Sequence, residues 1–439
     1  MKHVHVHGHE NVLLRASIIM IAVLAQASTH PTHARAQSIA ITNARIHTMA
    51  GPVIERGTVV FSNGRITAVG TNVSVPAGAR VIDGTGKVVT PGFIDSSTGL
   101  GTVEIDADDP SNDQSVTGDH ITAAFNVADN LNPLSTLLPV TRVEGITRAV
   151  VVPGNGSTII KGQGVLIDLG VQGTELTVHR NPVAMYATLG QAGAGRAGGS
   201  RAAALLRLRE ALQDARDYAN NRRAFESAQR REYALSRLDL DALQPVLRGE
   251  LPLVVSVERA SDILSALRLA RDFNLKLIVS GASEGWIVAR HLAASNTPVI
   301  VNPMNNIPGM EALGITLENA ARMHGAGVNV VFASFDSHNS RNLKQLAGNA
   351  VSYGMPYDAA LRAITVNPAR LWGAADRYGT LESGKDADVV VWSGDPLELT
   401  TAVEHVFIRG REMPDDTRQR ALFNRYRRLG GALPEAYNK

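Results

Sequence analysis

The stretch Gly281-Ala282-Ser283-Glu284-Gly285 has a spacing that suggests nucleophilic catalysis. Gly-x-Ser-x-Gly, placed on a strand-to-helix turn, presents the serine nucleophile in one class of hydrolases. That serine needs a histidine base and an acid that orients the base, and Asp336 with His338 or His405 would have to supply them. Asp336 and His338 stand only two positions apart, too close for one to orient the other toward a third residue. We therefore favour a structural role for the segment.

Two further patterns have plain structural interpretations. Residues 193–198 match Gly-x-Gly-x-x-Gly, but a dinucleotide fold needs a second strand within ~30 residues and none is evident before Leu253. We interpret this segment as a flexible loop that leads into a helix. Acidic side chains crowd the loop after the first strand of the central region, and we interpret them as a solvated acidic loop; they are Glu104, Asp106, Asp108, Asp109 and Asp113.

Composition narrows the classes of partner and cofactor. The 439 residues carry 43 basic and 41 acidic side chains, a formal net charge of +2, which is too weak a field to gather nucleic acid. We expect small molecules or proteins as partners. The chain has no cysteine, so disulfides, thiolate metal sites and cysteine nucleophiles are excluded. A bound metal would need His, Asp or Glu ligands.

The N-terminus has the pattern of a signal peptide. Arg15 precedes an apolar run from Ala16 to Ala27, and Ala34-Arg35-Ala36 offers a cleavage site before Gln37. The run is shorter than the ~20 apolar residues that span a bilayer, so we expect no membrane span. Residues 1–36 are thus predicted to be removed, and the protein to be exported to the periplasm. Cleavage would discard a histidine tract, His3, His5, His7 and His9.

Strand patterns at the two ends predict one small domain. β-branched runs recur between residues 38 and 89, and Asn63-Gly64 between two of them predicts a tight hairpin. Similar runs return at 388–392 and 403–408. We expect residues 37–90 and 375–413 to form a composite β-sandwich domain. A helical tail is expected over 414–439.

The central region, residues 91–374, alternates short strands with amphipathic helices. This pattern predicts an α/β fold in which helices wrap a parallel sheet, and eight units would close a TIM-like (β/α)8 barrel with its site at the C-terminal ends of the strands. Apolar residues at helical spacing between about 193 and 250 predict a helical insertion on that barrel.

Two long motifs resemble the amidohydrolase superfamily, especially its imidazolonepropionase-like and peptidase-like branches. Val89-Thr90-Pro91-Gly92-Phe93-Ile94-Asp95 is similar to the start of that family's first barrel strand. The segment from Gly379 to Asp388 is similar to its link from the barrel back to the β-domain, where Gly-Lys-x-Ala-Asp is typical. Residues 360–369 resemble the helix and turn before that link. The resemblance covers nearly all of the chain after residue 37.

The resemblance also places the family's metal ligands on particular residues. The family's first strand continues as His-x-His, and those positions are Ser97 and Gly99 here. Its single histidines at the ends of the fifth and sixth strands fall on Ser256 and Gly281. Its aspartate at the end of the eighth strand, which binds metal and takes the proton from water, falls on Asp336.

These replacements leave the cofactor unknown. The family implies a divalent metal such as zinc, but hydroxyl groups and glycine are poor substitutes for imidazole. Asp336 is the predicted catalytic residue, Asp336 and His338 are the candidate metal ligands, and Glu284, Ser256 and Ser97 are the predicted substrate contacts. Asp95 and His179 also lie near predicted strand ends and could help to rebuild a site.

Two functions stay open. The resemblance implies a hydrolase of carbon–nitrogen bonds in amides, cyclic amides or dipeptide-like molecules, with an altered or lost metal site. The alternative is a catalytically inactive barrel that binds a ligand or serves as a partner subunit of an active relative. A small-molecule ligand is expected in either case, and both a homo-oligomer and a pairing with an active relative remain open.

Overall fold

The computed structural model describes residues 38–427 apart from 119, 172, 174, 228, 230 and 231. The predicted signal peptide and residues 428–439 of the predicted tail lie outside the described residues. Helix α13 (Arg418–Tyr426) lies in the described part of that tail. Within the described part of the chain, every helix is too short or too polar to cross a membrane.

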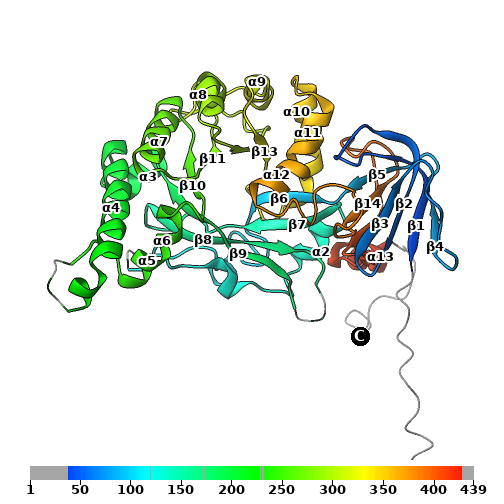
Figure 1. The fold of residues 1–439 in the computed structure, drawn as a ribbon, viewed down its shortest axis with the longest axis horizontal. Helices are drawn as coiled ribbons and strands as arrows, with labels where there is room; N and C mark the ends of the chain where they lie inside the picture. Colours follow the sequence, from blue (N-terminus) through cyan, green and yellow to red (C-terminus); the bar gives the residue numbers. More distant parts are fainter. Residues whose placement is uncertain are drawn as a thin grey trace, which may run out of the picture.

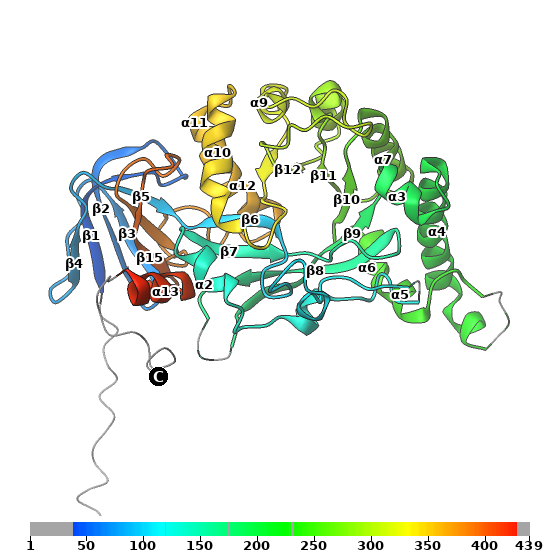
Figure 2. The same cartoon turned by 180° about the vertical axis from the view of Figure 1, so that it is seen from behind.

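Strands from both ends of the chain share one sheet of eight strands (Figures 1 and 2). Its order is β16-β15-β14-β5-β1-β2-β3, and β4 pairs with β1. The strands are β1 (Ile39–Ile46), β2 (Ile54–Ser62), β3 (Arg65–Gly70), β4 (Arg80–Asp83), β5 (Val88–Pro91), β14 (Val389–Trp392), β15 (Val403–Ile408) and β16 (Arg411–Glu412). Asn63 and Gly64 have φ angles of 51° and 78°, as the predicted hairpin requires. That the sheet folds into a sandwich stays a prediction.

A second sheet of eight strands forms a nearly closed barrel. Its strands follow one another in chain order: β6 (Phe93–Thr98), β7 (Ile146–Val151), β8 (Ile160–Asp168), β9 (Val178–Thr188), β10 (Leu253–Val257), β11 (Leu277–Gly281), β12 (Val299–Val301) and β13 (Val330–Phe332). The Phe335 amide donates to the Ser97 carbonyl at 3.0 Å, which draws the chain after the last strand against the first. The predicted TIM-like barrel is therefore confirmed as a nearly closed eight-stranded barrel.

One strand departs from the predicted all-parallel arrangement. β8 runs antiparallel to both β7 and β9, whereas the other neighbouring pairs are parallel. The reason is the length of the connections, because a parallel crossover takes a dozen or more residues and β7 is joined to β8 by residues 152–159 alone. Hairpins, rather than helical crossovers, therefore connect β7 to β8 and β8 to β9.

Helices cover the opposite side of the barrel, where α7 to α11 lie over β10 to β13 (Figure 1). The helices of the barrel are α2 (Leu137–Arg142), α3 (Gly190–Arg196), α4 (Arg201–Glu226), α5 (Arg237–Ala242), α6 (Gln244–Leu247), α7 (Ala260–Phe273), α8 (Ala289–Ala294), α9 (Asn319–Gly325), α10 (Leu343–Ser352), α11 (Tyr357–Ala363) and α12 (Val366–Leu371). The predicted insertion corresponds to α3 to α6, between β9 and β10. Most of the Gly-x-Gly-x-x-Gly segment lies in α3, so the interpretation as a flexible loop is wrong there. Gly193 is buried, and a Cβ on it would lie 2.8 Å from the Thr188 carbonyl oxygen.

A buried ion-pair network joins the barrel to the end sheet. The Arg148 guanidinium on β7 lies 2.6 Å from an Asp388 carboxylate oxygen, 3.5 Å from Asp386 and 3.6 Å from Asp168. Arg148 is fully buried, so the pairing must offset a large loss of hydration. Asp386 and Asp388 belong to the Gly-Lys-x-Ala-Asp motif, which therefore links the two sheets. The His179 ring also lies here, 3.5 Å from Asp168, and burial lowers its pKa to about 2.

Candidate functional site

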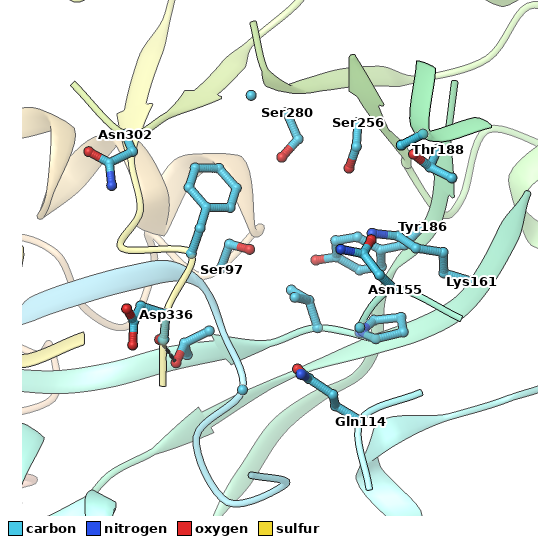
Figure 3. A pocket seen from close by; sticks show the side chains of 18 of the residues that line it. Ser97, Gln114, Asn155, Lys161, Tyr186, Thr188, Ser256, Ser280, Asn302 and Asp336 are labelled. Atoms are coloured by element: carbon cyan, nitrogen blue, oxygen red, sulfur yellow. Dashed lines mark hydrogen bonds between the residues drawn. The ribbon is translucent and has the colours of Figure 1, made fainter. Parts of the chain in front are cut away.

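A cavity of about 720 Å³ lies at the C-terminal ends of the parallel barrel strands. Every strand of the barrel, or the residues directly after it, contributes to the wall (Figure 3). This is the position at which barrels of this type carry their sites. The wall carries many hydroxyl and amide side chains from the strands and from the loops between them; these are Ser97, Gln114, Asn155, Thr188, Ser256, Ser280, Asn302 and Asn305.

The structure brings the five positions implied by the resemblance into this one cavity. Ser97 lies on β6 and Gly99 directly follows it, Ser256 lies on β10, Gly281 ends β11, and Asp336 follows β13. Counted around the barrel, β10 is the fifth strand, β11 the sixth and β13 the eighth. The placement of these positions on strands one, five, six and eight therefore agrees with the sheet order.

Asp336 is held in place by a short turn. Its Oδ1 accepts a hydrogen bond from the Asn339 amide at 2.8 Å, and its Oδ2 accepts one from the Asn339 side chain at 3.0 Å. Thr98 on β6 donates its hydroxyl to the Asp336 carbonyl at 2.8 Å, and the preceding residue, Phe335, has a φ of 56°. A carboxylate offers about four acceptor positions, so Asp336 keeps acceptor capacity for a water or a ligand.

Asp95 ties the two walls that carry Ser97 and Asp336 to each other. Its carboxylate accepts hydrogen bonds from the Ser97 amide at 3.2 Å, the Ser334 amide at 3.1 Å and the Ser340 hydroxyl at 2.6 Å. Complete burial raises the pKa of Asp95 to about 6, although these hydrogen bonds pull it down. Asp95 does not line the cavity, and its role is to position residues that do.

Two of the predicted site residues lie outside the cavity wall. Glu284 accepts hydrogen bonds from the Ala260 amide at 3.0 Å and the Gly314 amide at 2.9 Å, so its carboxylate holds the start of α7 instead of facing a ligand. The His338 ring lies 3.9 Å from the Asp106 carboxylate. Neither residue is among those that line the cavity.

The Gly-x-Ser-x-Gly segment forms no nucleophilic site. The Ser283 hydroxyl donates to the Glu258 carboxylate at 2.5 Å and accepts from the Asn305 amide group at 3.1 Å. Its partners in the described structure are thus an acid and an amide, not a histidine base. The structural role favoured for this segment agrees with these contacts.

The residues at the four ligand positions do not fit the family's metal. Ser97 and Ser256 offer only neutral hydroxyls. Across the described residues, no cluster of three or more His, Cys, Asp or Glu side chains could hold a metal ion. Neighbours also fill the space at the glycines: a Cβ on Gly281 would lie 2.2 Å from Glu258 Oε1, and one on Gly99 would lie 2.6 Å from Ser337 Oγ. Glu258 and Ser337 therefore leave no room for a larger side chain at Gly281 or Gly99 in this arrangement.

Two polar residues of the wall, Lys161 on β8 and Tyr186 on β9, were missed by the sequence analysis. The available signal was Ile160-Lys161-Gly162, a charged residue and a glycine inside an apolar strand run. An isolated glycine in a strand indicates a bulge, and bulges re-aim side chains near sites.

A model of the Amidohydrolase family matches residues 255–413. An amidohydrolase of Hapsidospora irregularis, tasK, is 25% identical over 399 residues, which are 82% of this chain and 40% of that protein. An imidazolonepropionase of Sphingopyxis alaskensis is 41% identical over 64 residues, or 14% of this chain and 16% of that protein. The chain thus spans less than half of the length of either curated relative.

Solved structures extend the similarity to the whole fold. An amidohydrolase from Thermotoga maritima has a TM-score of 0.77 and 28% identity, covering 85% of this chain and 99% of that chain. Molinate hydrolase has a TM-score of 0.56 and 18% identity, covering 91% of this chain and 100% of that chain. At that identity the second likeness shows the fold alone.

Proposed function

The chain belongs to the amidohydrolase superfamily, and we propose that it hydrolyses a carbon–nitrogen bond of a small polar molecule without the family's usual metal site. The observation that carries the proposal is the position of Asp336, which stands on the cavity wall opposite polar side chains of β8 to β10 (Figure 3). Amides, cyclic amides and dipeptide-like molecules are the substrate class. Ser97 and Ser256, both on the wall, are the proposed substrate contacts.

The proposed reaction uses the chain's own residues. Water ordinarily attacks at neutral pH after a cation has lowered its pKa from about 16 to about 7, but the donors here do not fit such an ion, so no step passes through a metal. Asp336 takes a proton from the attacking water as the water oxygen bonds to the carbonyl carbon. The protonated Asp336 then returns that proton to the nitrogen as the carbon–nitrogen bond breaks, so the products are a carboxylic acid and an amine. A positioned base contributes about 10²- to 10⁴-fold, so we expect a slow enzyme.

The second candidate is a barrel that binds a ligand without hydrolysing it, alone or as the partner of an active relative. The contacts of the two glycines favour it, because Glu258 and Ser337 occupy the space that an imidazole at Gly281 or Gly99 would need. The signal peptide predicted over residues 1–36 supports the periplasm as the proposed location for either function.

Turnover by Asp336→Asn separates the two candidates. Wild type, Asp336→Asn and the surface control Asp272→Asn would be assayed on N-acyl amino acids, cyclic amides and dipeptides, with release of the amine as the readout. Asp272 pairs with Arg209 on the outside of the barrel. The proposal expects about a 100-fold loss in Asp336→Asn alone. Rates no higher than the uncatalysed reaction in all three proteins would favour the non-catalytic barrel, whereas equal rates above it would overturn the role of Asp336.

A further inference from the structure

Lys161 owes its direction to a β-bulge. Ile160 pairs with Ala187 and Gly162 pairs with Tyr186, so Lys161 is the extra residue of β8. Gly162 has a φ of +116°, and a Cβ on it would lie 2.4 Å from the Phe125 carbonyl oxygen. Only glycine fits this backbone. The bulge turns the Lys161 side chain into the cavity wall, and it is the kind of feature that re-aims a side chain at a site.

Tyr186 brings a second polar group to the same wall. Its side chain is 3% exposed and its hydroxyl has no hydrogen-bond partner among the described residues. Gly164 leaves room for the ring, since a Cβ there would lie 2.6 Å from Tyr186 Cε2. Burial raises the pKa of Tyr186, so the phenol keeps its proton. A buried donor without a partner is destabilising unless a ligand or water satisfies it.

The charge of Lys161 is not balanced within the described residues. Burial and the nearby Arg196 guanidinium lower its pKa to about 8, and no acidic side chain acts on it in the opposite direction. The acids of the cavity are engaged elsewhere: Glu258 with Ser283, Glu311 with Arg201 and the Gln191 amide, and Asp336 with Asn339. The Asp106 carboxylate lies 3.9 Å from the His338 ring.

We propose that Lys161 and Tyr186 form a subsite for a carboxylate group of the ligand. One carboxylate oxygen accepts from the ammonium and the other from the phenol, and Asn155 on the same wall (Figure 3) offers a further donor. Charge-assisted hydrogen bonds of this kind are the strong ones. The inference rests on the cavity of the proposed function and narrows its substrate class to molecules that carry a carboxylate.

Chemical labelling of Lys161 tests the subsite directly. An isothiocyanate reacts with the neutral amine, and peptide mapping measures the rate at Lys161. The probes are N-acyl amino acids, short dicarboxylates and aromatic carboxylates, each beside its neutral amide, with inorganic phosphate as a separate arm. We expect at least one carboxylate at millimolar concentration to slow labelling about tenfold more than its amide does. Equal protection by every pair, or no protection by any, would overturn the proposal, and protection by phosphate alone would assign the site to phosphate esters instead.

Ligand-observed NMR on variants adds an independent readout. For the protecting carboxylate we expect Lys161→Met to weaken binding about 10- to 100-fold and Tyr186→Phe about 2- to 10-fold. Lys276→Met, at an exposed lysine outside this cavity, should bind as wild type does. Unchanged binding by Lys161→Met would refute the subsite. Carboxylate binding without turnover would refute the proposed hydrolase but support the subsite. Asp336-dependent turnover of neutral amides, without carboxylate binding, would support the hydrolase and refute the subsite.

Discussion

Replacing Lys161 by methionine should stabilise the protein. The substitution keeps an unbranched side chain of similar length but removes a charge that the fold holds partly out of water. The pKa of Lys161 falls from 10.5 to about 8 on folding. Each pKa unit corresponds to about 1.36 kcal/mol, so the charged lysine costs about 3 kcal/mol of folding stability at neutral pH. We expect Lys161→Met to recover most of that free energy of unfolding at pH 7.

The effect has a defined pH dependence. Below pH 8 the lysine is charged in both states and wild type bears the full penalty; between pH 8 and 10.5 only the unfolded chain holds the proton, so wild type gains stability as pH rises. The advantage of Lys161→Met should therefore shrink to nearly zero by pH 10.5. Urea denaturation of wild type, Lys161→Met and Lys276→Met at several pH values measures it. A Lys161→Met protein no more stable than wild type at pH 7 would show that Lys161 has a partner within the fold, and would contradict the reasoning behind the carboxylate subsite.

Three further predictions concern the framework of the cavity. Gly162→Ala should lower the unfolding free energy by more than about 1 kcal/mol, because it adds strain at φ +116° and a clash with the Phe125 carbonyl; an unchanged urea midpoint would refute the bulge. Arg148→Met should cost about 3–5 kcal/mol, since it leaves the buried Asp388 carboxylate without its arginine partner, and a melting temperature equal to that of wild type would contradict the network. Asp95 is protonated more readily in the folded state, so it lowers stability as pH rises from about 4 to about 6. In Asp95→Asn that part of the pH profile should flatten, and an identical profile would count against the raised pKa.

Much of the fold could be predicted from sequence because local chemistry fixes it. Asn63-Gly64 required a hairpin, and the alternating strands and helices over residues 253–363 required a layered α/β arrangement. The antiparallel direction of β8 could not be predicted in this way, since the apolar pattern of a buried strand is the same for either direction. Its direction follows from short connections on both sides, which become evident only when the bounds of β7 and β9 are known.

The cavity was predictable to a different degree. The motif that ends at Asp95 resembles the family's first barrel strand. Through that resemblance and the expected strand ends, the sequence placed five positions in one site: Ser97, Gly99, Ser256, Gly281 and Asp336. Glu284 was misleading because the sequence does not show that its carboxylate accepts from the amides at the start of α7. Lys161 was missed because its role depends on a bulge, a long-range pairing of β8 with β9. Residues that act through register or tertiary contact leave little trace in a single sequence.

Metal content tests the central claim most directly. The chain beginning at Gln37, which excludes the N-terminal histidine tract, would be incubated with zinc, manganese, iron or nickel, desalted and analysed by mass spectrometry of its metals. We predict far less than one metal per chain, with the same value for Asp336→Asn. One equivalent of metal per chain that is lost in Asp336→Asn would contradict the account.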